Sequence, residues 1–161
     1  MVRQGGLYAE GGIQASMKPW WLMHEERIAY HLNGRRVPGS GSGKRKGDVW
    51  VGKDWMIEAK TTTRCSYTLN IKTLDKIAQQ SMMMGLCGAL LIVFHRSYTD
   101  FVRFALVLER RCENLSPDWR SISLTPEKLE VGIELSSRYG IWKSMTFSEF
   151  QELVLDHGGG L

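Results

Sequence analysis

Residues 47–60 predict two short strands joined by a tight turn. In the first apolar run, Val49 and Val51 are two residues apart and so share one face of a strand. Residues 55–57 form the second apolar run. Gly52, Lys53 and Asp54 lie between the runs and have the composition of a turn. Because a hairpin returns the chain beside itself, the residue before the first strand should lie next to the residues that follow the second.

Three ionisable residues stand at the open end of this predicted hairpin. Asp48 precedes the first strand, and Glu58 and Lys60 end the second. Residues two apart in a strand share a face, so Glu58 and Lys60 should project together while Ala59 points away. Two carboxylates and an ammonium at one point favour a bound Mg²⁺, for which carboxylates are typical protein ligands. A surface ion pair between Glu58 and Lys60 is the alternative.

Residues 19–33 predict an amphipathic helix that Gly34 ends. Trp21, Ile28, Ala29 and Leu32 form its buried stripe. Glu25 falls within this stripe, and a carboxylate on a buried face needs a partner. A nearby Arg or Lys is one such partner.

The positive charge of the chain is concentrated in its first half. Residues 1–80 hold 13 Lys and Arg against 7 Asp and Glu, whereas the whole chain has a net charge of +4. A basic run without an acidic residue comes just before Asp48 and comprises Arg35, Arg36, Lys44, Arg45 and Lys46. The run indicates either a solvated loop or, the interpretation we favour, an edge that binds a polyanion.

A glycine- and serine-rich loop, residues 38–44, separates the two halves of the basic run. It fails as a Walker loop, because Pro38 stands where the first glycine is required and Arg45 stands where Ser or Thr is required. Ser40 and Ser42 could still approach a phosphate closely. A flexible connector is the alternative.

The rest of the chain predicts an α/β fold with a mixed central sheet flanked by helices. Asn70 caps an expected helix over 71–84, between a possible strand at 65–69 and buried strands at 89–94 and 102–108. Residues 109–161 should add a helical extension, with helices beginning at Thr125 and at the capping box Thr146–Glu149. We expect residues 1–16 to be a flexible arm and 17–161 to be a single domain.

The cysteines and the apolar runs indicate a cytoplasmic protein. Cys65, Cys87 and Cys112 are odd in number and lack zinc-site spacing, which argues against disulfides and favours a reducing compartment. No signal peptide is expected at the N-terminus. The longest apolar run, residues 85–94, is too short to cross a bilayer, so no membrane partner is expected.

The spacing of Asp48, Glu58, Ala59 and Lys60 resembles the core of the PD-(D/E)XK nuclease superfamily. The wider run, which includes the Gly-Ser loop, Ile57 and Tyr67, is similar to archaeal-type Holliday junction resolvases over residues 19–108. The resemblance implies a restriction-endonuclease-like sheet and a nuclease domain with its core at 19–108 and an extension at 109–161. It also implies a homodimer that cuts branched DNA.

The resemblance further implies a role for each candidate residue. Glu25, Asp48, Glu58 and the carbonyl of Ala59 would bind one or two Mg²⁺, for which Mn²⁺ should substitute, and Lys60 would orient the attacking water. Glu26 competes with Glu25, because it precedes Arg27 as in the family's Glu-Arg pair. The Gly-Ser loop with Ser40 and Ser42 would contact DNA. An endonuclease acting on ordinary duplex and a non-cleaving binding module on the same fold are the rival functions.

Overall fold

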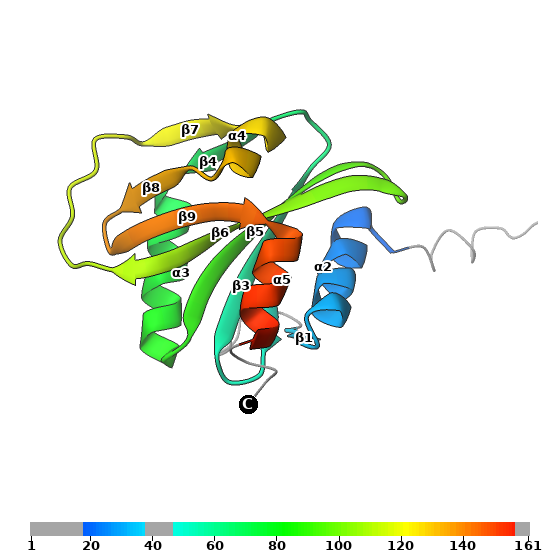
Figure 1. Cartoon of the computed structure of the whole chain (residues 1–161), viewed down its shortest axis with the longest axis horizontal. Helices are drawn as coiled ribbons and strands as arrows, with labels where there is room; N and C mark the ends of the chain where they lie inside the picture. The colour runs from blue at the N-terminus through cyan, green and yellow to red at the C-terminus, as the bar shows by residue number, and fades with distance from the viewer. Residues whose placement is uncertain (1–17, 38–46, 157–161) are drawn as a thin grey trace, which may run out of the picture.

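The computed structural model describes residues 18–37 and 47–156 (Figure 1). Seven strands form a central sheet in the order β1-β2-β3-β5-β6-β9-β8. The sheet is mixed and mostly antiparallel, because β3 and β5 form its parallel pair and the other neighbours run antiparallel. The predicted α/β class with a mixed sheet flanked by helices is therefore confirmed.

The first half of the chain builds one edge of the sheet and its centre. Helix α2 (Trp20–His31) leads into the short strand β1 (Arg35–Arg36), and the predicted hairpin follows as β2 (Val49–Val51) and β3 (Trp55–Thr62). Strand β4 (Tyr67–Asn70) leaves the central sheet and pairs with β7 (Ser121–Leu124) in a separate two-stranded sheet. Helix α3 (Ile71–Met84) then connects to β5 (Cys87–Ser97), which lies beside β3.

Helix α3 begins and ends where its sequence predicts. The Asn70 side chain accepts a hydrogen bond from the Lys72 amide at 2.9 Å, and Gly85 ends the helix with φ 69°. These caps satisfy backbone groups that a helix terminus leaves without partners. The connection between the parallel strands β3 and β5 is therefore defined by local sequence signals.

The second half of the chain completes the sheet, which corrects the expectation of a purely helical extension. Strand β6 (Asp100–Arg111) pairs with β5 and with β9 (Gly140–Thr146), and β8 (Glu134–Ser137) forms the far edge. The two expected helices are present as α4 (Pro126–Val131), capped by Thr125, and α5 (Phe147–Val154), opened by the predicted capping box. The segment thus contributes strands to both sheets as well as two helices.

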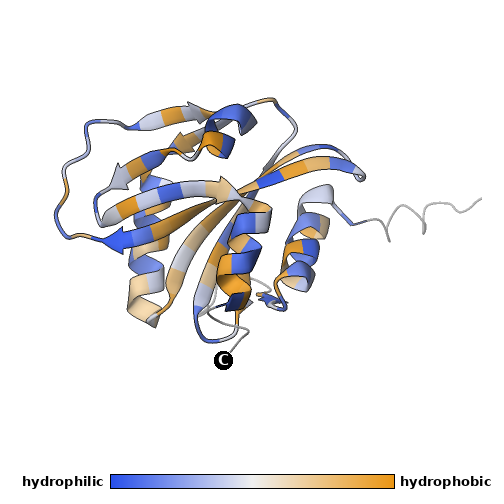
Figure 2. Ribbon diagram, in the orientation of Figure 1, coloured by the Kyte–Doolittle hydropathy of each residue, from blue (hydrophilic) through white to orange (hydrophobic). Residues whose placement is uncertain are grey.

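Two apolar clusters cover the two faces of the central sheet. One contains Ile28, Ala29 and Leu32 of α2 together with Phe147, Phe150 and Val154 of α5. The other holds the buried side chains of α3 and α4 and of the two-stranded sheet, including Leu74, Leu129 and Leu69. Hydrophobic and hydrophilic residues alternate along α5, as expected for a helix with one face against the sheet (Figure 2). Trp21, which we expected in the buried stripe of α2, is instead 48% exposed.

Candidate active site

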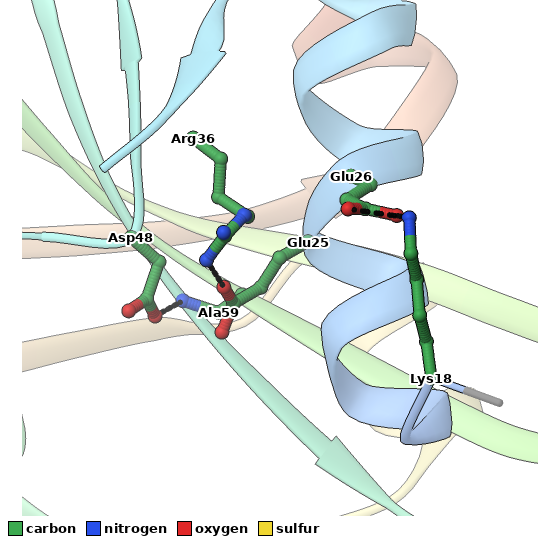
Figure 3. A network of polar contacts seen from close by, with 6 residues as sticks. All are labelled: Lys18, Glu25, Glu26, Arg36, Asp48 and Ala59. Atoms are coloured by element: carbon green, nitrogen blue, oxygen red, sulfur yellow. Dashed lines mark hydrogen bonds and ion pairs between the residues drawn. The ribbon is translucent and has the colours of Figure 1, made fainter. Parts of the chain in front are cut away.

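The β2–β3 hairpin places the Asp48 carboxylate against the backbone of β3. Val49 pairs with Ile57, and the Asp48 amide donates a hydrogen bond to the Ile57 carbonyl at 2.8 Å. One step further, the Asp48 Oδ2 accepts a hydrogen bond from the Ala59 amide at 2.8 Å (Figure 3). The Asp48 carboxylate thereby pairs with a backbone amide of β3 that β2 is too short to reach, and it is held beside residues 58–60.

Gly47 allows this approach. Its φ is +83°, and a Cβ atom at this position would lie 2.6 Å from the Cγ of Met56. A residue with a side chain would therefore meet both an unfavourable backbone conformation and a buried side chain. The glycine sets the direction in which the chain enters the hairpin, and with it the position of Asp48.

The Ala59 carbonyl faces the same open edge of β3. In the described part of the chain, β2 pairs only with residues 55–57 of β3, so the strand is uncovered on that side from Glu58 onward. The N–H and C=O groups of one strand residue point to the same neighbour, and every second residue repeats the direction. Because the Ile57 carbonyl and the Ala59 amide both point to Asp48, the Ala59 carbonyl points there as well.

Glu25 reaches this edge from helix α2, and Glu26 does not. The Glu25 side chain is 14% exposed and points toward Arg36 and Ala59 (Figure 3). Its pKa is raised from 4.5 to about 7 by burial and by the negative charges of Asp48 and Glu58, against which Arg36 acts. Glu26 lies on another side of the helix and pairs with Lys18 at 3.0 Å. The structure thus brings Glu25, rather than Glu26, together with Asp48 and Glu58.

Arg36 is part of the carboxylate cluster. A nitrogen of its guanidinium lies 3.8 Å from a carboxylate oxygen of Glu25, and its pairing with Val49 places it beside the start of the hairpin. Its neighbour Arg35 is exposed. Sequence reasoning assigned both arginines to DNA binding, and only the structure distinguishes them, because a run of basic residues does not show which member faces an acid. Ser40, Ser42, Lys44, Arg45 and Lys46 lie outside the described residues.

Glu58 and Lys60 project from the same face of β3, as their spacing predicts. The Lys60 Nζ lies 3.6 Å from the Glu58 Oε2, and the pair is unequally covered, with the side chains 43% and 17% exposed. Burial and the negative charge of Asp48 raise the pKa of Glu58, while Lys60 and Lys76 lower it. Lys76 belongs to α3 and was not recognised from the sequence, since no motif shows that its helix lies over β3.

The donor set fits a hard divalent cation. Glu25, Asp48 and Glu58 repel one another, and this repulsion helps to raise the pKa of Glu25 and of Glu58. A bound cation would offset the repulsion, and carboxylate and carbonyl oxygens are ligands that Mg²⁺ accepts. In residues 18–37 and 47–156, however, no three His, Cys, Asp or Glu side chains are close enough to form a metal-binding group. The three acids are therefore close enough to affect one another's charge, but they are farther apart than the ligands of a bound metal ion.

No protein-family model matches the chain, and the curated proteins contain no significant match. Among the described helices, none is long and apolar enough to span a membrane.

Proposed function

We propose that this protein is a metal-dependent endonuclease that hydrolyses phosphodiester bonds in DNA, on a restriction-endonuclease-like sheet. The observation that carries the proposal is the gathering of Glu25, Asp48 and Glu58 at the open edge of β3, with Lys60 beside Glu58. A four-way junction is the leading substrate, through the resemblance of residues 19–108 to junction resolvases.

Asp48, Glu58, Glu25 and the Ala59 carbonyl would hold Mg²⁺. The ion would supply Lewis-acid stabilisation of the phosphoryl oxygens and lower the pKa of a water molecule. Asp48 is already fixed for this role by its hydrogen bond with the Ala59 amide. Arg36 holds the Glu25 side chain and offsets part of its charge in the free protein.

Lys60 is suited to act on the attacking water and on the charge that develops in the transition state. Its side chain is the more exposed member of the pair with Glu58, so its ammonium can reach a bound phosphate. It would orient the water and stabilise the pentacoordinate phosphorus. The attacking water loses a proton to solvent as its oxygen bonds to phosphorus, the bond from phosphorus to the leaving oxygen breaks, and that oxygen takes up a proton from solvent. No covalent enzyme intermediate is required.

Cleavage assays with metal and with chelator test the proposal. Labelled junction, fork, nicked and linear duplexes are incubated with Mg²⁺ or EDTA, using the wild type, Asp48→Asn and Glu58→Gln. Each substitution should slow cleavage by about 10²-fold or more, because it removes one charged donor from the site. Asp54→Asn is the matched control, since Asp54 lies in the exposed turn of the same hairpin.

The substrates separate the proposal from its rivals. Cutting of linear duplex at the same rate as the junction would assign an ordinary duplex endonuclease. Binding without cutting of any substrate would leave the non-cleaving module. Unchanged cleavage by Asp48→Asn, or cleavage that persists in EDTA, would contradict the proposed site.

A further inference from the structure

A cavity of about 570 Å³ lies beyond the catalytic end of β3. It is formed where the segment after β3, including Arg64, meets Phe94 and Arg96 of β5, Asp100 and Val102 of β6, and the first turn of α4 with Glu127. None of these residues belongs to the cluster of Glu25, Asp48 and Glu58. The volume falls within the range of about 300–1,000 Å³ that is usual for small-ligand pockets.

The cavity lies at the end of the sheet. Its lining includes Phe94 on the face of Glu58 and Lys60, and also His95 and Phe101, which contact His24 of α2 on the opposite face. Glu58, Lys60 and Thr62 pair with Leu90, Ile92 and Phe94 of β5, and side chains of directly paired residues share a face. The three β5 residues all belong to the cluster beneath α3, and Phe94 lines the cavity. From Lys60 to residue 63 the strand advances about 10 Å, which equals roughly three nucleotides of B-form rise.

Charged groups around the cavity are not paired with one another. Neither Arg64 nor Arg96 forms an ion pair with a carboxylate of residues 18–37 or 47–156, and the ion pairs of this part of the chain involve other residues. Asp100 and Glu127 are likewise exposed and outside these pairs. Two cationic donors and two anionic acceptors therefore surround a pocket with the apolar residues Phe94 and Val102 in its lining.

We propose that this cavity takes up one unstacked nucleotide of the DNA strand next to the scissile bond, an inference that rests on the proposed nuclease function. Arg64 and Arg96 match the phosphate of such a nucleotide, and an exposed guanidinium plane also offers a stacking surface for its base. Asp100 and Glu127 match amino groups on the base edge. The carboxylates of Asp100 and Glu127 would repel a series of adjacent phosphates. A single nucleotide therefore fits the lining better than the backbone of a duplex does.

The lining also selects among the bases. Cytosine, adenine and guanine carry an exocyclic amino group that can donate to a carboxylate, and thymine carries none. A base can enter only after leaving its stack, which costs least where pairing is already interrupted. The cavity thus favours DNA that is branched or mispaired within about three nucleotides of the cut. It provides a structural reason for choosing such DNA over regular duplex.

A fluorescence experiment tests this inference. 2-Aminopurine, which brightens when it leaves the base stack, is placed at each of several positions around the branch point of a junction. The protein carries Glu58→Gln to prevent cleavage, and complex formation is followed separately by anisotropy. Emission should rise several-fold at one or two adjacent positions on the strand that the wild type cuts. The rise should be lost when Arg64→Ala and Arg96→Ala are added.

Arg110→Ala is the control, because it removes one exposed cation from the other end of β6 and should leave the rise intact. Replacing the responding base by thymine instead of cytosine should slow wild-type cleavage by about tenfold. If the wild type cuts DNA and the complex forms without a rise at any position, the nucleotide pocket is refuted and the nuclease stands. If the wild type cuts no substrate, the proposed function fails and the pocket proposal fails with it.

Discussion

Glu25 and His24 are neighbours in α2 whose titrations should affect stability in opposite directions. Burial and the charges of Asp48 and Glu58 raise the pKa of Glu25 from 4.5 to about 7, with Arg36 opposing them. His24 is fully buried, and its Nε2 lies 2.8 Å from the His95 Nδ1. Burial, followed by the positive charges of His95, Arg27 and Arg103, lowers the pKa of His24 from 6.5 to about 4.

The sign of each effect follows from which state binds the proton more tightly. The folded protein binds the Glu25 proton more tightly than the unfolded chain, so that contribution is complete below pH 4.5 and is lost as the pH rises through about 7. The folded protein binds the His24 proton more weakly, so that contribution is complete above pH 6.5 and is lost as the pH falls through about 4. Each amounts to about 3 kcal/mol at most, since a tenfold change in proton affinity is worth about 1.4 kcal/mol.

Single substitutions should reveal the two opposed contributions. Glu25→Gln resembles the protonated acid, so in EDTA at pH 8 it should be more stable than the wild type by up to about 3 kcal/mol, and equally stable near pH 4.5. His24→Gln should remove the loss of stability that protonation of His24 causes as the pH falls. The free energy of unfolding of this variant should then decrease more steeply as the pH rises, because only the effect of Glu25 remains. Urea unfolding, followed by tryptophan fluorescence from pH 4 to pH 8, measures both differences. The pH slope is the readout, because either variant can change the absolute stability.

Metal binding should narrow the difference in stability between the wild type and Glu25→Gln at pH 8. A ligand that binds only the folded state stabilises it by about 2.7 kcal/mol at a hundredfold excess over its dissociation constant. Mg²⁺ at pH 8 should therefore stabilise the wild type more than Glu25→Gln. The reasoning would be refuted if Glu25→Gln followed the wild-type pH dependence in EDTA, since Glu25 would then have an ordinary pKa.

Three further predictions concern the hairpin, the basic run and the assembly. Gly47→Ala should lower the free energy of unfolding by about 1–3 kcal/mol and displace Asp48, because its Cβ would meet Met56. Gly85→Ala is the control, since Gly85 has a positive φ but no atom near its Cβ, and should cost less; equal losses of stability in urea unfolding would exclude the contact with Met56 as the cause. If the basic run neutralises about four phosphates, log K should fall with log salt at a slope near −3.6, and replacing Lys44, Arg45 and Lys46 by Ala should flatten it; an unchanged slope in binding titrations would place the DNA elsewhere. Sedimentation should show a two-fold dimer that prefers junctions in competition, because two symmetric cuts need two centres; a monomer indifferent to branching would contradict this.

The elements that the sequence predicts well are those defined by neighbouring residues. The β2–β3 hairpin follows from a turn between two apolar runs, and α3 follows from its caps and its periodicity. Strand β9 was missed although local signals for it exist, since Trp142 and Ser144 alternate with more exposed residues and a two-residue turn joins β9 to β8. Its place inside the central sheet could not be predicted, because its other partner, β6, is distant in sequence. Trp21 was wrongly placed in the core, since periodicity gives the face of a helix but not how far the sheet extends beneath it.

The candidate site was predictable to the extent that it lies on one hairpin. The pairing register of the hairpin brings Asp48, Glu58 and Lys60 together, and the spacing of these residues in the sequence is enough to predict that register. The choice between Glu25 and Glu26 required the docking angle of α2, and the pairing of Arg36 with Glu25 required the position of β1. Both depend on tertiary packing, which single-sequence patterns do not specify.

The shared cluster of α2 and α5 has a consequence for biosynthesis. Ile28 and Leu32 near the start of the chain pack in one cluster with Phe150 and Val154, so α2 has no complete surface to dock on until α5 has been translated. The ribosome adds roughly 5–20 residues per second, which leaves Glu25 without its final support for several seconds after it is made. In a nascent chain, Glu25 should therefore reach its final position beside Asp48 and Glu58 only after residues 147–154 have been made.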